Sequence, residues 1–305
     1  LLSLGDITSP IPVSIHPNSS LFQLNHLHTL NLDNNYFYPS SSIPHNIGRL
    51  RNLRHLKLSG FVGKIPTEIS YLSNLVSLDL SYNYGLQLDE RTFETMLHNF
   101  TNLELLSLSY VNISSPIPVN ISSSLRYLDL GYTHLRGVLT ESFFLHPNLE
   151  NLKLGDNSLL KGVLPKIHPS NTLLKLDMSF TGISGELPDS IGTLSSLNIL
   201  NLYGCQFSGS IPDSVGNLTQ ISELDFSDNN FTGPIPSTIS KLKQLTSLDL
   251  SDNIFIGSFP STIETLTRLQ HLYLSSNSLS GPLPSNASML QKLNFLDLSN
   301  NSLNG

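Results

Sequence analysis

Histidine pairs are the first place where this sequence could do chemistry, because imidazole is a common metal ligand. His26 and His28 stand two residues apart, on a segment whose alternating pattern predicts a strand. No cysteine or carboxylate stands beside them, so the donor set that zinc needs is incomplete. We interpret both as surface residues at the edge of a repeat, and we predict no metal site and no cofactor.

Motifs for phosphate binding and nucleophilic catalysis are also incomplete. Residues 60–65 resemble a phosphate-binding loop, but they lack the four-residue gap between the glycines and a Ser or Thr after Lys64. No G-x-S-x-G nucleophile elbow occurs. A catalytic triad is defined by a geometry that a sequence does not show. We therefore predict that the chain is not an enzyme and has no catalytic residues.

Three tyrosines recur at one position, two residues after the last leucine of an L-x-L segment: Tyr82, Tyr110 and Tyr132. If that position lies on the exposed face of adjacent strands, the rings form a ladder with a spacing of roughly 5 Å. Exposed tyrosines often anchor interfaces, although a purely structural stack explains the pattern equally well. The residues predicted to contact a ligand are Tyr82, Tyr110, Tyr132, Phe180, Tyr203, Tyr127 and Lys57.

Carboxylates recur one residue before the same leucine. They either keep the sheet soluble and unpaired or contact a ligand, and the sequence favours the first role. They are Asp79, Asp129, Asp177, Asp225, Asp249 and Asp297.

Asn-x-Ser/Thr triplets are candidate glycosylation sites, and they favour an extracellular address. Some must arise by chance, because Ser and Asn are abundant. Asn217 and Asn99 lie in an outward N-[LF]-T segment, where a glycan has room, so these two are predicted to be occupied. The single cysteine, Cys205, neither supports nor excludes secretion. The full set is Asn18, Asn99, Asn112, Asn120, Asn217, Asn230, Asn286 and Asn300.

These positions are set by an internal repeat with a period close to 24 residues. Between Leu154 and Leu298 every interval is 24, and a degenerate copy at Leu4 brings the predicted number of coils to thirteen. Nothing interrupts the pattern, so we predict a single array over residues 1–305. The last apolar residues of the repeated segments are Leu32, Leu58, Leu80, Leu108, Leu130, Leu154, Met178, Leu202, Phe226, Leu250, Leu274 and Leu298.

Each coil has internal positions with distinct physical roles. Leucines that alternate with polar residues predict a short strand with one buried face. Asn253 represents a position at the following turn, where a side-chain amide can satisfy backbone groups of the adjacent coil. Thr133, Thr181 and Cys205 take the same position elsewhere and should pack there. A proline after each turn makes that segment irregular or edge-like.

Composition narrows the possible partners. The formal net charge is −7, the pI is about 5.7, and no Lys/Arg run occurs, which argues against binding to a nucleic-acid backbone. Apolar stretches are broken by polar residues well short of a membrane span. We predict no nucleic-acid partner and no transmembrane helix within these residues.

One coil, at about 83–107, departs from the pattern. Its residues Phe93, Met96, Leu97 and Phe100 stand at i, i+3, i+4 and i+7, which predicts a short helix, and Asp89 is available as its N-cap.

The repeated Ile-Pro pairs and I-G-x-L segments resemble the plant-specific class of leucine-rich repeats over the whole chain. Examples are Ile65-Pro66, Ile211-Pro212 and the segment 191–194. The resemblance implies an α/β solenoid: a right-handed leucine-rich-repeat superhelix with a concave parallel β-sheet and convex 3-10 or irregular segments. The helix-bearing coil is similar to the corresponding stretch of plant receptor-like proteins, which are cell-surface receptors without a kinase domain.

Membership in that family implies a function and further segments. The chain is expected to be the ligand-binding ectodomain, or an inner part of one, on the extracellular face of the plasma membrane. It would bind an extracellular peptide, protein or glycan in defence or development and signal through a receptor-kinase co-receptor. Signal peptide, cysteine-paired caps, island and membrane helix are expected outside this chain. The alternative is a secreted, cell-wall inhibitor similar to polygalacturonase-inhibiting proteins, which the irregular helix-bearing coil disfavours.

Overall fold

The computed structural model describes residues 2–3, 14–35, 37, 40–117, 121–283 and 290–304. The chain forms two compact units, Leu1–Gly137 (unit 1) and Val138–Gly305 (unit 2), and each is described by itself. The predictions of one array over residues 1–305 and of thirteen coils stay predictions.

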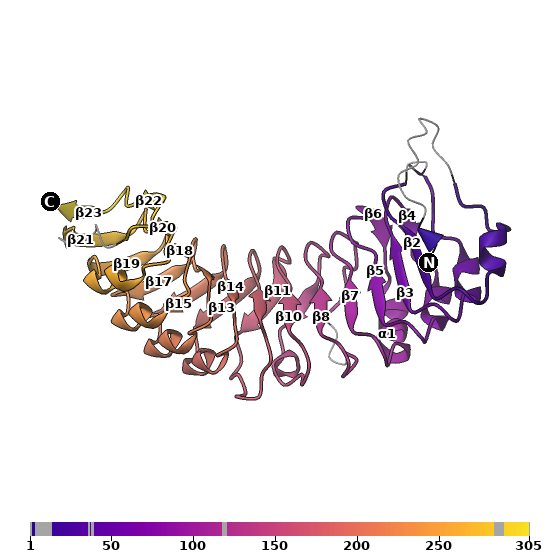
Figure 1. Cartoon of the computed structure of the whole chain (residues 1–305), viewed down its shortest axis with the longest axis horizontal. Coiled ribbons are helices and arrows are strands. Elements are labelled where there is room, and N and C mark those ends of the chain that lie inside the picture. The colour runs from indigo at the N-terminus through magenta and orange to yellow at the C-terminus, as the bar shows by residue number, and fades with distance from the viewer. Residues whose placement is uncertain are drawn as a thin grey trace. The chain divides into compact units, whose positions relative to one another are not determined.

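Unit 1 contains a sheet of parallel strands that follow one another in sequence order (Figure 1). The register aligns the central leucines, so that Leu30, Leu56 and Leu78 form one buried row. Burying a leucine stabilises a fold by roughly 1.5–3 kcal/mol, so this row holds neighbouring coils together. The strands are β1 (Leu2–Ser3), β2 (Thr29–Leu32), β3 (His55–Leu58), β5 (Ser77–Asp79), β7 (Leu105–Ser107) and β8 (Tyr127–Asp129), and β4 (Val62–Lys64) pairs with β6 (Gly85–Gln87) beside them.

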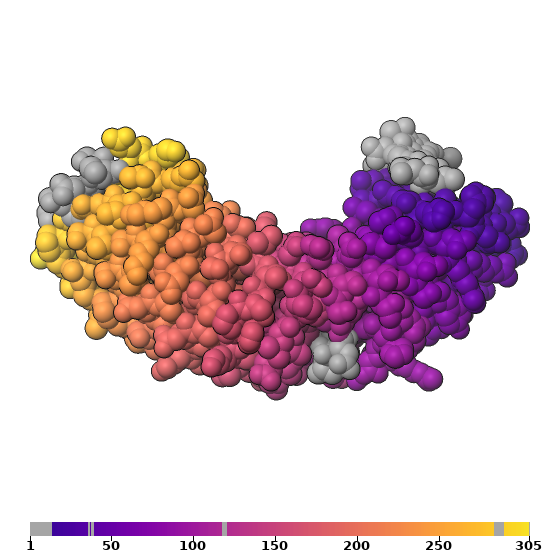
Figure 2. Space-filling model, turned by 60° about the horizontal axis from the view of Figure 1, so that its bottom comes forward, coloured from indigo at the N-terminus to yellow at the C-terminus, as the bar shows by residue number. Residues whose placement is uncertain are grey.

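Unit 2 repeats the arrangement with a more regular spacing. Its principal strands are β10 (Asn151–Lys153), β12 (Lys175–Asp177), β14 (Ile199–Asn201), β16 (Glu223–Asp225), β18 (Ser247–Asp249), β20 (His271–Tyr273) and β22 (Phe295–Asp297). In the space-filling view the colours of each unit change in chain order, as expected when each coil contacts its neighbours in sequence (Figure 2).

A second row of parallel strands flanks the principal sheet of unit 2, and the sequence did not predict it. These strands come directly after the turn and end at or next to glycines such as Gly209, which has a φ of 75°. The segment was expected to be irregular or edge-like because of its proline, yet in most coils the ladder forms before the proline is reached, and β21 ends on Pro282 itself. The strands are β11 (Leu159–Val163), β13 (Gly182–Glu186), β15 (Gln206–Gly209), β17 (Asn230–Gly233), β19 (Ile254–Ser258), β21 (Ser278–Pro282) and β23 (Ser302–Asn304), and β9 (Arg136–Val138) lies at the boundary of the units.

Short 3-10 helices return the chain toward the next strand, as the resemblance implied. Most begin after a proline, for example Pro212, whose φ of −70° suits the start of a helical turn. They end at a leucine such as Leu218, whose backbone N–H donates to the carbonyl of Val215. The helices are η1 (Ser20–Gln23), η2 (His45–Arg49), η3 (Thr67–Tyr71), η4 (Glu141–Phe143), η5 (Asp189–Thr193), η6 (Asp213–Asn217), η7 (Ser237–Lys241) and η8 (Ser261–Thr265).

The predicted helix in the irregular coil is confirmed as α1 (Glu90–Asn99). Phe93, Met96 and Leu97 are buried on its inner face. The carboxylate of Asp89 caps it, accepting from the Thr92 backbone N–H at 3.0 Å and from the Thr92 hydroxyl at 2.8 Å. The helix packs beside η3, in the place that a 3-10 turn takes in other coils.

Buried and half-buried asparagines link successive coils through both ends of their side-chain amides. Asn229 Nδ2 donates to the Leu202 carbonyl of the preceding coil at 2.8 Å, and its Oδ1 accepts from the Phe207 backbone N–H at 3.0 Å. Asn83, Asn253, Asn277 and Asn301 make equivalent bonds. The predicted role of this position is therefore confirmed.

The cap on α1 gives a prediction about stability and pH. Asp89→Ala should lower the free energy of unfolding by about 1 kcal/mol, because it leaves the first-turn N–H groups without the cap. The backbone N–H of Thr92 holds the pKa of Asp89 below its ordinary value of 3.8. A lowered pKa means that the contribution is present above pH 3.8 and is lost as the pH falls through the lower folded-state value.

Urea denaturation at pH 7 and at about pH 3 measures this effect. The exposed helix residue substitution Glu94→Ala is the control and should change stability by less than about 0.5 kcal/mol at both pH values. Equal stabilities of parent and Asp89→Ala at pH 7 would contradict the assignment.

The asparagines that link successive coils give a second prediction. Asn229→Leu should destabilise unit 2 by about 2–6 kcal/mol, since it leaves a buried carbonyl and a buried N–H without partners, each costing about 1–3 kcal/mol. Thermal denaturation followed by circular dichroism checks this, with the neighbouring exposed substitution Asn230→Leu as control. A melting temperature unchanged in Asn229→Leu would show that the amide bonds contribute nothing.

Candidate ligand-binding surface

The predicted tyrosines occupy turns rather than strand positions, which corrects the sequence prediction. Tyr82, Tyr110 and Tyr132 follow β5, β7 and β8 and have φ values of 60°, 66° and 56°. The chain needs one left-handed residue to leave the strand and enter the interior. Left-handed conformations are uncommon outside glycine and asparagine. The principal strands are too short, at three residues or so, to include this position.

Aspartates of the preceding column bond to the turns of their own coils, although Ser107 takes that position before Tyr110. Asp79 Oδ1 accepts from the backbone N–H of Ser81 at 3.0 Å and from its hydroxyl at 2.6 Å. The same pair of bonds recurs at Asp177, Asp225, Asp249 and Asp297. Burial raises the pKa of Asp225 even though Ser227 bonds to it. The acidic column therefore has a structural role that the sequence did not reveal.

The three rings form a stack with the expected spacing. The ring centroids of Tyr82 and Tyr110 are 5.2 Å apart with 25° between the planes, and those of Tyr110 and Tyr132 are 4.3 Å apart with 13°. Tyr82 is 62% exposed and Tyr132 is 44% exposed, while Tyr110 between them is half-buried. Such contacts are worth about 0.5–1.5 kcal/mol each, enough to hold the rings in place.

A fourth tyrosine joins the stack, and the sequence analysis missed it. Tyr84 is 73% exposed, and its ring centroid lies 4.9 Å from that of Tyr110. It belongs to the irregular coil and falls outside the repeating column, so a scan of equivalent positions does not find it. Its closeness to Tyr82 in the sequence is the one signal that could have pointed to Tyr84. We refer to Tyr82, Tyr84, Tyr110 and Tyr132 as the tyrosine cluster.

In unit 1 the side chains of Lys57 and Tyr127 pair with nearby aspartates. Lys57 lies on β3, and its Nζ is 2.9 Å from Asp33 Oδ2 and 3.4 Å from Asp79 Oδ2. The hydrogen bond with Asp33 raises the pKa of Lys57. Tyr127 on β8 donates its hydroxyl to Asp129 Oδ2 at 3.2 Å. Both side chains keep part of their surface exposed, but neither belongs to the ring stack described above.

Phe180 and Tyr203 form a separate aromatic pair in unit 2. Their ring centroids are 4.5 Å apart with an edge-to-face angle of 66°. Phe180 also has a positive φ, 50°, in the turn after β12. The predicted contact residues thus fall into two sets, one in each unit.

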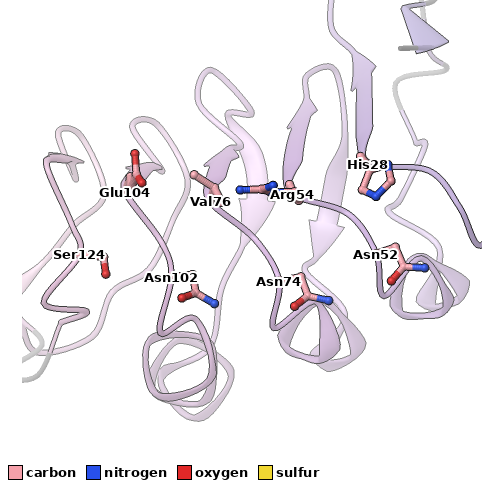
Figure 3. A pocket seen from close by; sticks show the side chains of 8 residues that line it. All are labelled: His28, Asn52, Arg54, Asn74, Val76, Asn102, Glu104 and Ser124. Carbon is pink, nitrogen blue, oxygen red and sulfur yellow. The ribbon is translucent and has the colours of Figure 1, made fainter.

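A polar groove at the opposite ends of the unit 1 strands was not predicted. It has a volume of about 480 Å³ (Figure 3). Three asparagines, one per coil, lie in a row along it: Asn52, Asn74 and Asn102. The Nδ2 atoms of Asn52 and Asn74 donate to carbonyls of the preceding coil, those of Asn25 and Arg51, at 2.6 and 2.9 Å. The other lining residues are His28, Arg54, Val76, Glu104 and Ser124.

The structure separates the candidate glycosylation sites by accessibility. Asn217 ends η6 with an exposed side chain, whereas Asn99 is half-buried and its Nδ2 donates to the Ser70 carbonyl at 3.0 Å. The sites Asn18, Asn112, Asn230 and Asn300 are exposed, and Asn120 and Asn286 lie outside the described residues.

Reactive chemistry has little support in the part of the chain that the structure describes. Within it, no group of three or more His, Cys, Asp or Glu side chains is placed to hold a metal ion. Cys205 is buried, with Sγ 3.0 Å from the Met178 carbonyl oxygen, and burial raises the pKa of its thiol. None of the described helices has the length and apolar character to cross a membrane. That the chain is not an enzyme stays a prediction.

Comparison with known proteins agrees with this architecture. A leucine-rich-repeat family model matches residues 243–303, and a second one matches residues 26–50, 172–194, 196–218 and 220–242. The chain belongs to the leucine-rich-repeat family. Among solved structures, this leucine-rich-repeat chain is similar to the crystal structure of a TDR receptor, with a TM-score of 0.81 and 30% identity, covering 91% of this chain and 48% of that one. The predicted solenoid is confirmed.

Similar curated proteins are plant receptor-like proteins. Receptor-like protein 6 of Arabidopsis thaliana is 42% identical over 198 residues, 62% of this chain and 20% of that protein. Receptor-like protein Cf-9 of Solanum pimpinellifolium is 43% identical over 193 residues, 62% of this chain and 22% of that protein. The predicted resemblance is confirmed, and the leucine-rich-repeat chain spans about a fifth of the length of these relatives.

Accessibility gives a prediction about glycosylation. When the leucine-rich-repeat chain is expressed through the secretory pathway of plant or insect cells, Asn217 should be glycosylated to a higher degree than Asn99. A glycan on Asn99 must displace its bond to Ser70, whereas Asn217 is exposed. Peptide mass spectrometry before and after enzymatic deglycosylation measures both occupancies, and Asn217→Gln is the control. Higher occupancy at Asn99 would contradict the role of the Ser70 bond.

Proposed function

We propose that this chain is the ligand-binding part of the ectodomain of a plant cell-surface receptor-like protein, and that the tyrosine cluster contacts the ligand. The protein would lie on the extracellular face of the plasma membrane and signal through a partner receptor kinase. The observation that carries the proposal is the tyrosine cluster itself, an exposed aromatic surface with rings held in fixed positions.

The geometry of the cluster favours a peptide or protein ligand over a glycan. Stacking between Tyr82, Tyr110 and Tyr132 covers the ring faces that they share, so the cluster presents mainly ring edges to a partner, together with the outer ring face of Tyr82. Sugar rings pack on aromatic faces, whereas peptide side chains and carbonyls can use edges and phenol hydroxyls. Tyrosine offers large contact area at a low cost in conformational entropy, which is why it concentrates in interfaces.

Two comparisons support this choice. The receptor kinase HAESA of Arabidopsis, whose solved ectodomain is in complex with a peptide hormone, has a TM-score of 0.61 and 27% identity to this chain, covering 96% of this chain and 68% of that one. The curated relatives are receptor-like proteins rather than secreted inhibitors. The helix-bearing coil with α1 also departs from the uniform repeats expected of an inhibitor.

The central ring provides the test. Tyr110→Ala should weaken binding of the cognate ligand by about 2 kcal/mol or more, because it removes an anchor and releases the three rings packed against it. Ser247→Ala, on β18 of unit 2, should change affinity little. Affinity titrations of parent and variants, with circular dichroism to verify folding, measure the difference. A folded Tyr110→Ala that binds like the parent would leave the cluster with a structural role only.

A further inference from the structure

The column that carries the tyrosines contains one position without a side chain, at Gly60. The strand register pairs Leu32 with Leu58 and Lys57 with Asp79, so Gly60 lies between Asn34 and Tyr82 in the same column. All three residues are exposed, and all three have a positive φ. Gly60 therefore leaves a space one coil wide beside the outer face of Tyr82.

Space above Gly60 is open among the residues that the structure describes. A Cβ added to Gly60 would meet only the Asn35 carbonyl oxygen and Phe37 Cδ2, both at an ordinary 3.5 Å. The equivalent glycine in unit 2 is different, since a Cβ on Gly204 would lie 2.7 Å from Phe180 Cδ1. A ring of the chain itself thus fills the space above Gly204, whereas the ring of Phe37 only borders the space above Gly60 at an ordinary contact distance.

Tyr82 has one ring face in the stack and the other toward this space. Its described stacking partner is Tyr110, in the following coil, while Gly60 stands in the preceding coil. Adjacent coils are roughly 4.8 Å apart, so Asn34 and Tyr82 are separated by about 10 Å. Stacked aromatic rings have centroids about 4.5–7 Å apart, and one flat ring fits between these two walls. We call this space, with Gly60 as its floor and Asn34 and Tyr82 as its walls, the Gly60 slot.

We propose that the Gly60 slot receives one aromatic side chain of a peptide or protein ligand, which stacks on the free face of Tyr82 and extends the tyrosine stack by one ring. This inference rests on the proposed function and specifies it, because it requires an exposed Trp, Tyr or Phe in the ligand. The ring gains a preformed stacking surface, and the side-chain amide of Asn34 lies on the other side as a hydrogen-bonding group.

Filling the slot tests the proposal. Gly60→Tyr places a ring where the ligand ring would bind, and the column already holds tyrosine at a positive φ in three coils. The matched control is Ser276→Tyr, which adds the same side chain at a φ of 54° in unit 2. Gly60→Asn is a second variant, because asparagine tolerates the left-handed conformation at Asn34 and narrows the slot with a smaller side chain.

The probe is N-acetyl-tryptophanamide, with N-acetyl-leucinamide and N-acetyl-argininamide as comparison probes. The chain has no tryptophan, so indole signals report the probe alone. Saturation-transfer NMR on the whole chain should show saturable binding of the indole to the parent and to Ser276→Tyr. The affinity for N-acetyl-tryptophanamide should fall about tenfold in Gly60→Tyr, because the variant loses one ring contact with the probe. The affinity of Gly60→Asn for the indole probe should lie between those of the parent and Gly60→Tyr.

Several results would overturn the slot. Absence of saturable indole binding to the parent, equal binding to parent and Gly60→Tyr, or tighter binding of the leucine or arginine probe would each do so. These results differ from a failure of the proposed function. If Tyr110→Ala loses the cognate ligand while Gly60→Tyr binds it like the parent, the tyrosine cluster is the binding surface and the slot is not part of it.

Discussion

The structure depends on satisfying backbone hydrogen-bonding groups between coils that are too small to fold alone. Each coil contributes one principal strand of about three residues, and its turn leaves a carbonyl and an N–H in the interior. Asn229 and its equivalents meet both groups with one amide. Threonine at the same position, as in Thr181, donates to a carbonyl of its own coil, and its hydroxyl also lies 3.4 Å from Cys205 Sγ of the next coil. The buried leucine rows add the apolar contact area that keeps one coil on the next.

That constraint also determines where binding residues can stand. The inward-facing strand positions are taken by leucine, and the turn between strand and asparagine has a left-handed residue, which in several coils follows a bonded aspartate. The side chain of the left-handed residue is free to point outward, because its backbone alone forms the turn. Aromatic residues at this position in successive coils stack at the coil spacing. The repeat therefore converts a column of sequence positions into a row of rings.

Irregularity concentrates the candidate site in unit 1. The coil that replaces a 3-10 turn with α1 also brings Tyr84 next to Tyr110, and Gly60 interrupts the column in the coil before it. In unit 2, where intervals are uniform, Phe180 instead leans over Gly204. Departures from the repeat are the places where the fold does not dictate the side chain, so they are where specificity can reside.

The sequence by itself determined the repeat, the buried leucine rows, the role of the asparagines and helix α1 with its cap at Asp89. Each of these depends on local spacing and on hydrogen bonds within one coil or between adjacent coils, which periodicity expresses directly. It also predicted the spacing of the Tyr82, Tyr110 and Tyr132 rings. Tertiary structure decided that these tyrosines lie in left-handed turns, that aspartates such as Asp79 bond to the turns of their own coils, and that Asn99 is bonded to Ser70. It alone revealed Tyr84, the second row of strands and the open space at Gly60. These features depend on backbone dihedral angles and on contacts between side chains of different coils, and the sequence pattern of a repeat specifies neither.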